Sequence, residues 1–249
     1  MDEPTFSEDK GIRYLHFGSP WIQGAMLLRQ PATLVLEYTR QMMAWLLLTD
    51  PPEQIGILGL GAGSLARFCY KHTSADLTVV EWNPRVTAAC YSYFRLPQDQ
   101  DRLFIHHEDA GAWVANRYNH RQFPVLMVDL YDGEAQGPVR ESLAFYQSCR
   151  KVVEARGETG VVAVNLFGNH ESFDRNWERL QEAFDGRVLL LPEVDGGNLI
   201  ALAVTGPKLV LDRGALIERA QAIETQYRLP ATKWAKSLTG VLINQGAGF

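Results

Sequence analysis

Short apolar runs and amphipathic stretches alternate along most of this chain, from residue 54 to residue 204. The apolar runs have the length of buried strands, and the stretches between them carry apolar residues at helical spacing. This alternation predicts an α/β fold with a mostly parallel sheet and right-handed crossovers. The predicted strands are 54–59, 76–81, 102–107, 124–129, 159–166, 187–193 and 198–204, and the helices lie near 63–72, 84–93, 109–117, 138–154 and 171–184.

The first fifty residues have a different pattern. Residues 12–17 alternate in polarity, a Gly-Ser-Pro turn follows, and residues 22–28 form a possible return strand. We therefore expect a small β-hairpin. Apolar positions at helical spacing then predict a helix over 34–48, which ends before Asp50-Pro51-Pro52.

A glycine-rich segment follows the first predicted strand of the sheet. The apolar run from Ile55 ends in Gly59, Gly61 and Gly63, and a predicted helix begins immediately. A strand, a tight turn and a helix N-terminus in this order form a nucleotide site, because glycine lets the backbone approach the ligand. The next strand ends in Glu81, which is placed to accept hydrogen bonds from a ribose. We predict a nucleoside site; an ordinary α/β turn is the alternative.

Acidic residues also follow the third and fourth predicted strands. Asp109 is placed to accept a hydrogen bond from an adenine amino group, or to cap the helix that begins at Ala110, and the two roles are compatible. Asp129 and Asp132 flank Tyr131 after the fourth strand. Two carboxylates in one cleft hold a cation or accept a proton from an ammonium group. The alternative is a pair of solvated loop acids that cap the next helix.

Composition narrows the functional classes. The chain has 249 residues, 46% of them hydrophobic, and a formal net charge of −5 with acids and bases mixed along it. A nucleic-acid-binding surface would need a basic stripe, which is missing. The polar first ten residues do not resemble a secretory leader, and no apolar run approaches the ~18 residues of a membrane span. The three cysteines lack metal-ligand spacing, so we expect buried thiols in the cytoplasm, and neither a metal nor a membrane partner.

The end of the sheet indicates the type of α/β fold. Asp195-Gly196-Gly197-Asn198 is a hairpin signal, so the last strand should run antiparallel to its partner. A seven-stranded sheet of this kind resembles the Rossmann-like fold of class I S-adenosylmethionine-dependent methyltransferases. The remainder contains one amphipathic helix, 212–228, and a tail, 239–249, that we expect to be flexible or to pack on a partner. We divide the chain into an N-terminal hairpin and helix (1–50), a Rossmann-like nucleoside-binding catalytic domain (51–206) and a C-terminal helix and tail (207–249).

Together these motifs resemble the spermidine synthase (polyamine aminopropyltransferase) family, in particular its bacterial spermidine-synthase-like subset. The resemblance runs from about residue 14 to residue 204. It rests on residues 22–26, Leu36-Glu37-Tyr38, Met42-Met43, residues 59–64, Glu81 with Asn83-Pro84, Asp109-Ala110, residues 129–132 and Gly137-Pro138.

The resemblance implies a reaction. Members transfer the aminopropyl group of decarboxylated S-adenosylmethionine to the amine of putrescine, and methylthioadenosine leaves. It also implies a small-molecule amine acceptor, no metal and a possible homodimer. It assigns Gln23 to the donor's tail, Glu81 to the ribose, Asp109 to the adenine, Asp129 to amine activation, and Tyr131 and Asp132 to the amine channel.

Two positions depart from the family pattern. The glycine loop has Ala62 where synthases carry an aspartate that binds the donor's amino group, and Thr39-Arg40-Gln41 stands where they carry Tyr-His-Glu. In this register, Arg40 would repel a diamine, or pair with the carboxylate of intact S-adenosylmethionine. Three functions therefore remain open: aminopropyl transfer, methyl transfer from S-adenosylmethionine, and nucleoside binding without catalysis.

Overall fold

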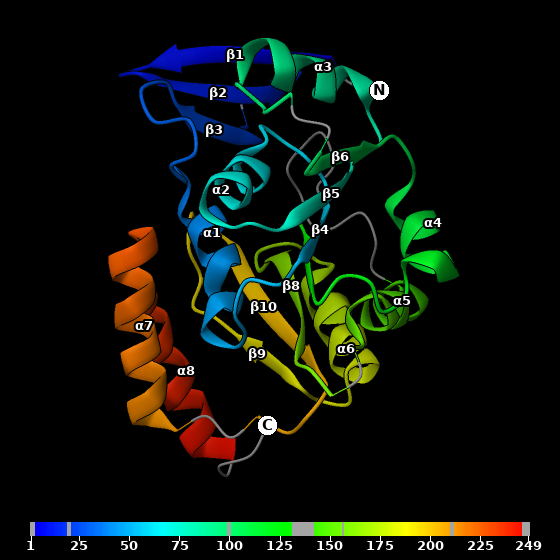
Figure 1. Cartoon of the computed structure of the whole chain (residues 1–249), viewed down its shortest axis with the longest axis vertical. Helices are drawn as coiled ribbons and strands as arrows, with labels where there is room; N and C mark the ends of the chain where they lie inside the picture. The colour runs from blue at the N-terminus through cyan, green and yellow to red at the C-terminus, as the bar shows by residue number, and fades with distance from the viewer. Residues whose placement is uncertain are drawn as a thin grey trace.

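A computed structural model describes residues 3–18, 21–98, 101–130, 142–155, 157–209 and 212–245. Within these residues the chain forms a large central sheet, a small sheet and surrounding helices (Figure 1). The strands of the central sheet are β4 (Gln54–Leu58), β5 (Asp76–Val80), β6 (Leu103–His106), β7 (Val125–Val128), β8 (Gly160–Phe167), β9 (Val188–Leu190) and β10 (Asn198–Thr205). The helices are α1 (Glu37–Gln41), α2 (Ser64–His72), α3 (Pro84–Tyr93), α4 (Ala110–Ala115), α5 (Leu143–Val153), α6 (Phe173–Ala183), α7 (Arg213–Tyr227) and α8 (Ala231–Gln245), with 3₁₀ segments η1 (Met42–Leu47) and η2 (Arg117–Asn119).

The central sheet has the strand order β6-β5-β4-β7-β8-β10-β9. The first five of these strands pair in parallel, whereas β10 runs antiparallel to both of its neighbours. Every residue of β7 is buried, because helices cover both faces of a parallel sheet and both must therefore be apolar. These findings confirm the predicted mixed sheet and its antiparallel last strand.

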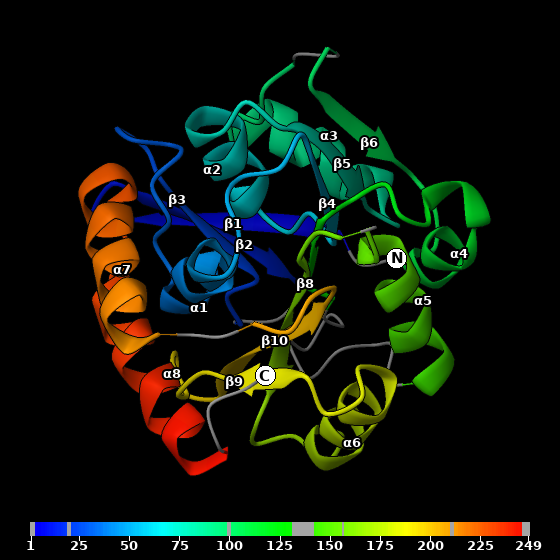
Figure 2. The ribbon, with the colours of Figure 1, turned by 60° about the horizontal axis from the view of Figure 1, so that its bottom comes forward.

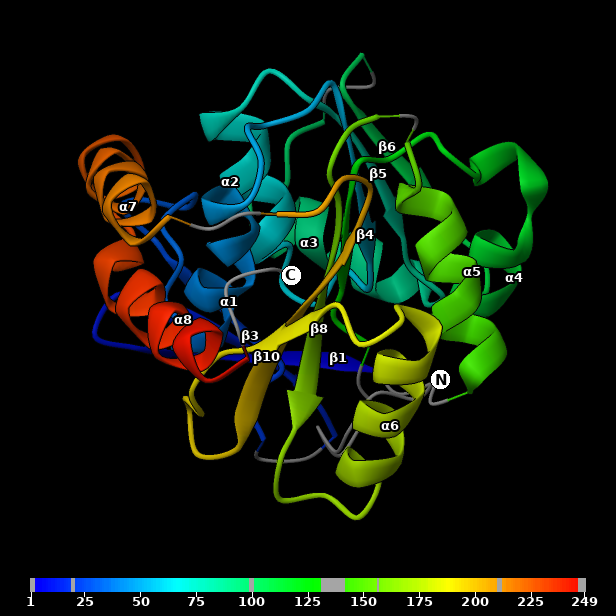
Figure 3. The same cartoon turned by 90° about the horizontal axis from the view of Figure 1, so that it is seen from below.

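Helices pack on both faces of the sheet and form a separate hydrophobic core on each face. Figure 3 shows α4, α5 and α6 on one side, where Trp113 and Tyr146 are buried. The segments α2, α3, η1, α7 and α8 lie on the other side, where Trp45 and Trp234 are buried (Figure 2). Among the described residues, no helix is both long enough and apolar enough to cross a membrane.

The 3₁₀ segment η1 is held from several directions. It packs against β8 on the sheet and against α7 and α8 outside it. Arg219 of α7 donates a hydrogen bond of 2.6 Å to the carbonyl of Leu46 and one of 2.8 Å to the carboxylate of Asp50. The C-terminal helices thus fix the segment that continues directly from α1.

The small sheet has one strand more than the predicted hairpin. Its strands β1 (Pro4–Asp9), β2 (Ile12–Phe17) and β3 (Gly24–Leu27) are antiparallel, and they lie next to α2 and α3 (Figure 1). Five of the six residues of β1 are exposed, so this strand has no apolar pattern that would reveal it. In contrast, β3 is mostly buried and runs to the glycine loop.

Other differences concern helix and strand ends. The predicted helix over 34–48 is a short α1 continued by η1. The strand predicted over 187–193 is shorter, and Pro192, which has no N–H to donate, follows it. No helix was predicted after residue 228, yet α8 fills much of that segment.

Candidate active site

The glycine loop and Asp129 lie side by side at the carboxyl edge of the sheet. Strands β4 and β7 pair directly, and the N–H of Asp129 donates a 2.9 Å hydrogen bond to the carbonyl of Leu58. After β4 the chain continues to β5, which lies on one side of this pair of strands, and after β7 it continues to β8, which lies on the other side. In open α/β sheets, ligands bind in the crevice at such a reversal of strand order.

The backbone of the loop requires its glycines. Gly59 has φ of +91°, and a Cβ there would lie 2.2 Å from the carbonyl oxygen of Asp129. Gly61 and Gly63 also have positive φ, and Gly63 is the N-cap of α2. A side chain at Gly59 would therefore separate the loop from Asp129.

The carboxylate of Glu81 is bonded to the same loop. Its Oε2 accepts a 3.0 Å hydrogen bond from the N–H of Leu60, and its Oε1 accepts one of 2.7 Å from the N–H of Asn83. Burial raises the pKa of Glu81, while the two backbone N–H groups and nearby His107 lower it. Each carboxylate oxygen has further lone pairs, so this rigid group suits binding of ribose hydroxyls.

Strand β3 covers the other side of the loop. The hydroxyl of Ser64 donates a 2.9 Å hydrogen bond to the carbonyl of Ala25. A Cβ on Gly24 would lie 2.6 Å from the Cβ of Ala62, and one on Gly61 would lie 3.3 Å from the carbonyl oxygen of Gln23. The structure therefore brings Gln23 to the glycine loop and buries Ala62 beneath Gly24.

Asp109 caps a helix, as one of its two sequence interpretations predicts. Its Oδ1 accepts a 2.9 Å hydrogen bond from the N–H of Ala112 in the first turn of α4. Asp109 follows β6, two strands away from the glycine loop in the same sheet. The cap uses one oxygen, so a role toward an adenine amino group remains compatible with it.

Asp129 is the enclosed carboxylate of the site. Its Oδ1 accepts a 2.9 Å hydrogen bond from Asn165 Nδ2 on β8, and its Oδ2 accepts a longer one of 3.4 Å from the hydroxyl of Tyr38 on α1. Burial raises the pKa of Asp129 to about 6, although both hydrogen bonds favour the charged form. A carboxylate with this pKa is ionised at neutral pH and is a stronger base than an ordinary aspartate.

Tyr38 is also held at its backbone. Its N–H donates a 2.7 Å hydrogen bond to Oδ2 of Asp195, in the turn between β9 and β10. Asp195 has φ of +50°, a conformation that aspartate and asparagine adopt more readily than most residues. The turn between the last two strands thus fixes the beginning of α1 beside Asp129.

Comparison with known proteins assigns the chain to a family. A model of the spermine/spermidine synthase domain matches residues 36–202, which include the glycine loop, Glu81, Asp109 and Asp129. The chain belongs to the spermine/spermidine synthase family. It is 33% identical to the polyamine aminopropyltransferase of Neisseria meningitidis, over 99% of this chain and 93% of that protein.

Solved structures share the fold. Human methyltransferase-like protein 13, in complex with SAH, is 25% identical with a TM-score of 0.66, covering 78% of this chain and 93% of that one. A spermidine synthase in complex with the transition state analogue AdoDATO is 19% identical with a TM-score of 0.66, covering 96% of this chain and 86% of that one. These similarities confirm the predicted methyltransferase-like fold.

The structure explains how this family member accommodates its two departures. The methyl group of Ala62 is buried against β3, where a carboxylate would be both crowded and desolvated. Arg40 is bonded within its own segment, to Glu37 at 3.2 Å and to the carbonyl of Leu34 at 2.9 Å. Its charge is therefore largely balanced by Glu37. Gln41 is buried and donates a 3.0 Å hydrogen bond to the carbonyl of Pro192.

Two predicted substrate-binding residues, Tyr131 and Asp132, lie outside the described residues.

Three residues that contact the site were not assigned a role from the sequence, namely Asn165, Tyr38 and Asp195. Asn165 shares one feature with Glu81 and Asp129, because it also lies near the carboxyl end of a predicted strand. Tyr38 and Asp195 gave no signal of proximity, since their contact spans 157 positions and involves a backbone N–H.

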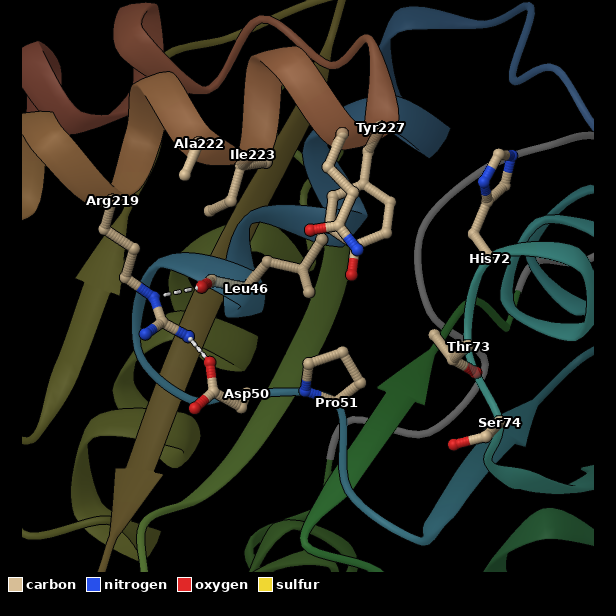
Figure 4. Close-up of a pocket in the computed structure, with 11 residues that line it drawn as sticks. Leu46, Asp50, Pro51, His72, Thr73, Ser74, Arg219, Ala222, Ile223 and Tyr227 are labelled. Atoms are coloured by element: carbon tan, nitrogen blue, oxygen red, sulfur yellow. Dashed lines mark hydrogen bonds and ion pairs between the residues drawn. The ribbon is translucent and has the colours of Figure 1, made fainter.

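A cavity of about 390 Å³ lies at the opposite edge of the sheet from the glycine loop (Figure 4). Its lining includes Asp50 and Pro51 before β4 and Thr73 and Ser74 before β5, so it faces the amino ends of the strands. Arg219 and Asp50 form an ion pair there at 2.8 Å. This ion pair links α7 to the segment that follows η1.

Proposed function

We propose that this chain transfers the aminopropyl group of decarboxylated S-adenosylmethionine to the primary amine of a polyamine-type acceptor. The observation that carries the proposal is Asp129, a buried carboxylate whose pKa is about 6, beside a glycine loop of nucleoside-binding form. Two further observations support it: membership of the family, and relatives named polyamine aminopropyltransferase.

The donor side of the site fits a nucleoside. Glu81 would bind the ribose hydroxyls through lone pairs that the N–H groups of Leu60 and Asn83 leave available. Asp109 would accept a hydrogen bond from the adenine amino group, because a carboxylate that caps a helix has more than one acceptor lone pair. Gln23, next to Gly61, would contact the donor's tail.

Asp129 would prepare the acceptor. A free amine with a pKa of ~10 is almost entirely protonated at neutral pH and cannot attack. Asp129 would take one proton from the ammonium group, which leaves the nitrogen lone pair free. The nitrogen then forms a bond to the aminopropyl carbon as the carbon–sulfur bond breaks, and the sulfur keeps that electron pair. The products are methylthioadenosine and the aminopropylated ammonium ion.

Asn165 and Tyr38 would orient Asp129 during this step. Their hydrogen bonds meet the two carboxylate oxygens from different elements, β8 and α1. Holding the nitrogen in line with the reacting carbon supplies much of the rate enhancement in such a displacement. From the family resemblance we also propose that Tyr131 and Asp132 contact the acceptor.

Mass spectrometry of the reaction products tests the proposal. Purified protein is incubated with decarboxylated or intact S-adenosylmethionine and a panel of amines. Methylthioadenosine together with an aminopropylated amine supports the proposal. S-adenosylhomocysteine would instead indicate methyl transfer, the alternative that Ala62 keeps open. Neither product, with nucleoside binding retained in a thermal-shift assay, would indicate a binding protein.

We further propose a cytoplasmic enzyme that forms homodimers. Cys69, Cys90 and Cys149 are buried free thiols, which suit a reducing compartment. The dimer follows from the resemblance, and the small N-terminal sheet offers an exposed strand, β1, for contact. Light scattering coupled to size-exclusion chromatography would give the oligomeric state.

A further inference from the structure

Two buried side chains donate hydrogen bonds to carbonyls of the glycine loop. The thiol of Cys90, on α3, donates one of 3.1 Å to the carbonyl of Gly61. Arg67, near the N-terminus of α2, donates to the carbonyl of the next residue, Ala62. Burial raises the pKa of Cys90 to about 12, so its thiol keeps the proton that it donates. Two consecutive carbonyls of the loop therefore point toward buried donors.

The guanidinium of Arg67 is bonded to main-chain carbonyls alone. It also donates to the carbonyl of Pro31 at 2.7 Å and to that of Phe94 at 2.9 Å, and its Nη2 has no hydrogen-bond partner among the described residues. Burial lowers the pKa of Arg67 to about 10, so the group is still charged at neutral pH. Burial and the nearby helix N-terminus both disfavour a cation. The stability of α2 therefore does not explain this arginine, whereas the three carbonyls do.

The other main-chain groups of the loop are fixed as well. The N–H of Leu60 donates to Oε2 of Glu81 at 3.0 Å, and the N–H of Gly63 donates to the carbonyl of Leu60 at 2.8 Å. Each residue from 60 to 63 thus has a main-chain group in a hydrogen bond. The carbonyl and the N–H of one trans peptide point in opposite directions. These bonds therefore determine which polar groups the loop presents to a ligand.

The backbone matters more here because position 62 has no polar side chain. The family resemblance expects an aspartate where this chain has Ala62. We propose that Cys90 and Arg67 are positioning residues, which hold the peptide groups of the glycine loop in their binding orientation and thereby set the affinity for the nucleoside part of the donor. This inference rests on the proposed function, in which that donor is decarboxylated S-adenosylmethionine.

Calorimetric titration with methylthioadenosine measures this affinity without turnover. Cys90→Ala removes the donor to the carbonyl of Gly61, whereas Cys90→Ser keeps a donor in the form of a hydroxyl. Cys69→Ala is the matched control. Cys69 is a buried thiol of α2 in the same hydrophobic core, and it has no hydrogen bond with the glycine loop.

We expect Cys90→Ala to weaken methylthioadenosine binding about threefold to tenfold, the range for loss of one buried hydrogen bond. Cys90→Ser and Cys69→Ala should both stay within about twofold of wild type, because neither removes a donor from the loop. The proposal is overturned if Cys90→Ala binds as tightly as wild type, or if Cys90→Ser or Cys69→Ala weakens binding equally.

Steady-state kinetics test the other positioning residue. Arg67→Lys keeps a positive charge but replaces the planar fork with a single ammonium, which does not match three carbonyls from three segments. The KM for decarboxylated S-adenosylmethionine should rise, with the KM for the acceptor unchanged, because Asp129 is held from α1 and β8. An equal rise in both constants would overturn the positioning role of Arg67.

The outcome for the inference is separable from that for the proposed function. An absence of aminopropylated product, with methylthioadenosine binding that weakens in Cys90→Ala, would contradict the proposed function alone. Aminopropylated product, with binding that is the same in wild type and Cys90→Ala, would contradict the inference alone. A wild-type protein that does not bind methylthioadenosine would overturn both.

Discussion

Asn165 Nδ2 donates a 2.9 Å hydrogen bond to Oδ1 of Asp129, and this bond links two neighbouring strands of the sheet at the site. The amide nitrogen favours the ionised form of a carboxylate that burial makes harder to ionise. Asn165 therefore influences both the position and the pKa of the carboxylate that we propose as the base.

Asn165→Ala should move the acidic limb of the pH–rate profile to higher pH. In the proposed role Asp129 acts as a base only when it is ionised, so kcat/KM should fall as the pH decreases through its pKa of about 6. Loss of the hydrogen bond raises that pKa further. Asn176→Ala is the control, since this buried asparagine is bonded to Tyr146. A limb that stays in place in Asn165→Ala would contradict the assignment of Asp129 as the base.

Asp129→Asn should abolish most turnover while nucleoside binding persists. A positioned general base contributes about 10²- to 10⁴-fold to a rate, and an amide cannot accept the amine proton. Single-turnover product formation gives the loss, and thermal shift with methylthioadenosine gives the binding. Turnover within a few-fold of wild type would exclude Asp129 as the base.

The same substitution should stabilise the fold at high pH. Burial raises the pKa of Asp129 from 3.8 to about 6, so the folded state binds the proton more tightly than the unfolded state. The resulting destabilisation is absent below pH 4 and complete above pH 6, where it amounts to about 3 kcal/mol. Urea unfolding of Asp129→Asn should therefore show a gain at pH 8 and none at pH 4. An equal gain at both pH values would point to a cause other than ionisation.

Gly59→Ala should lower the stability of the protein far more than Gly11→Ala. Both glycines have positive φ, but an added Cβ meets the carbonyl of Asp129 at position 59 and has nothing within 4 Å at position 11. The control reports the conformational cost alone, roughly 1–2 kcal/mol. Equal losses in thermal denaturation would show that the contact between the loop and Asp129 does not limit this position.

Ala62→Asp should not restore tighter donor binding. The side chain at this position is buried beneath Gly24, so a new carboxylate would be crowded and would lose solvation. We expect a lower melting temperature and no improvement in KM for decarboxylated S-adenosylmethionine. Ala62→Asn has nearly the same volume and separates crowding from charge. A fall in KM with unchanged stability would refute this account.

The strands that build the site were predictable because they are continuous apolar runs. In β4, β5 and β7 the predicted and observed ends differ by at most one residue, since burial on both faces leaves an unmistakable pattern. Because parallel strands end at one edge, the sequence also predicted that Gly59, Glu81 and Asp129 would come together.

The features that the sequence did not reveal either lie in solvent-exposed segments or depend on contacts between residues far apart in the chain. The strand β1 is polar and exposed, so its pairing with β2 leaves no trace in the pattern. The hydrogen bond from Tyr38 to Asp195 uses a backbone N–H, a group that every residue other than proline has. The type of residue at position 38 therefore does not indicate this partner.

The fastening of η1 by Arg219 makes the two substrate sides of the site depend on different parts of the chain. The proposed nucleoside side is built from the strands β3, β4, β5 and β6, whereas Tyr38 and Gln41 lie in α1, which continues into η1 and is held there by α7 and α8. Local unfolding of the C-terminal helices would therefore loosen the acceptor side first, with donor binding intact. Sequence drift in α7 and α8, far from any reacting atom, is thus a route by which relatives could change their acceptor while keeping the same donor.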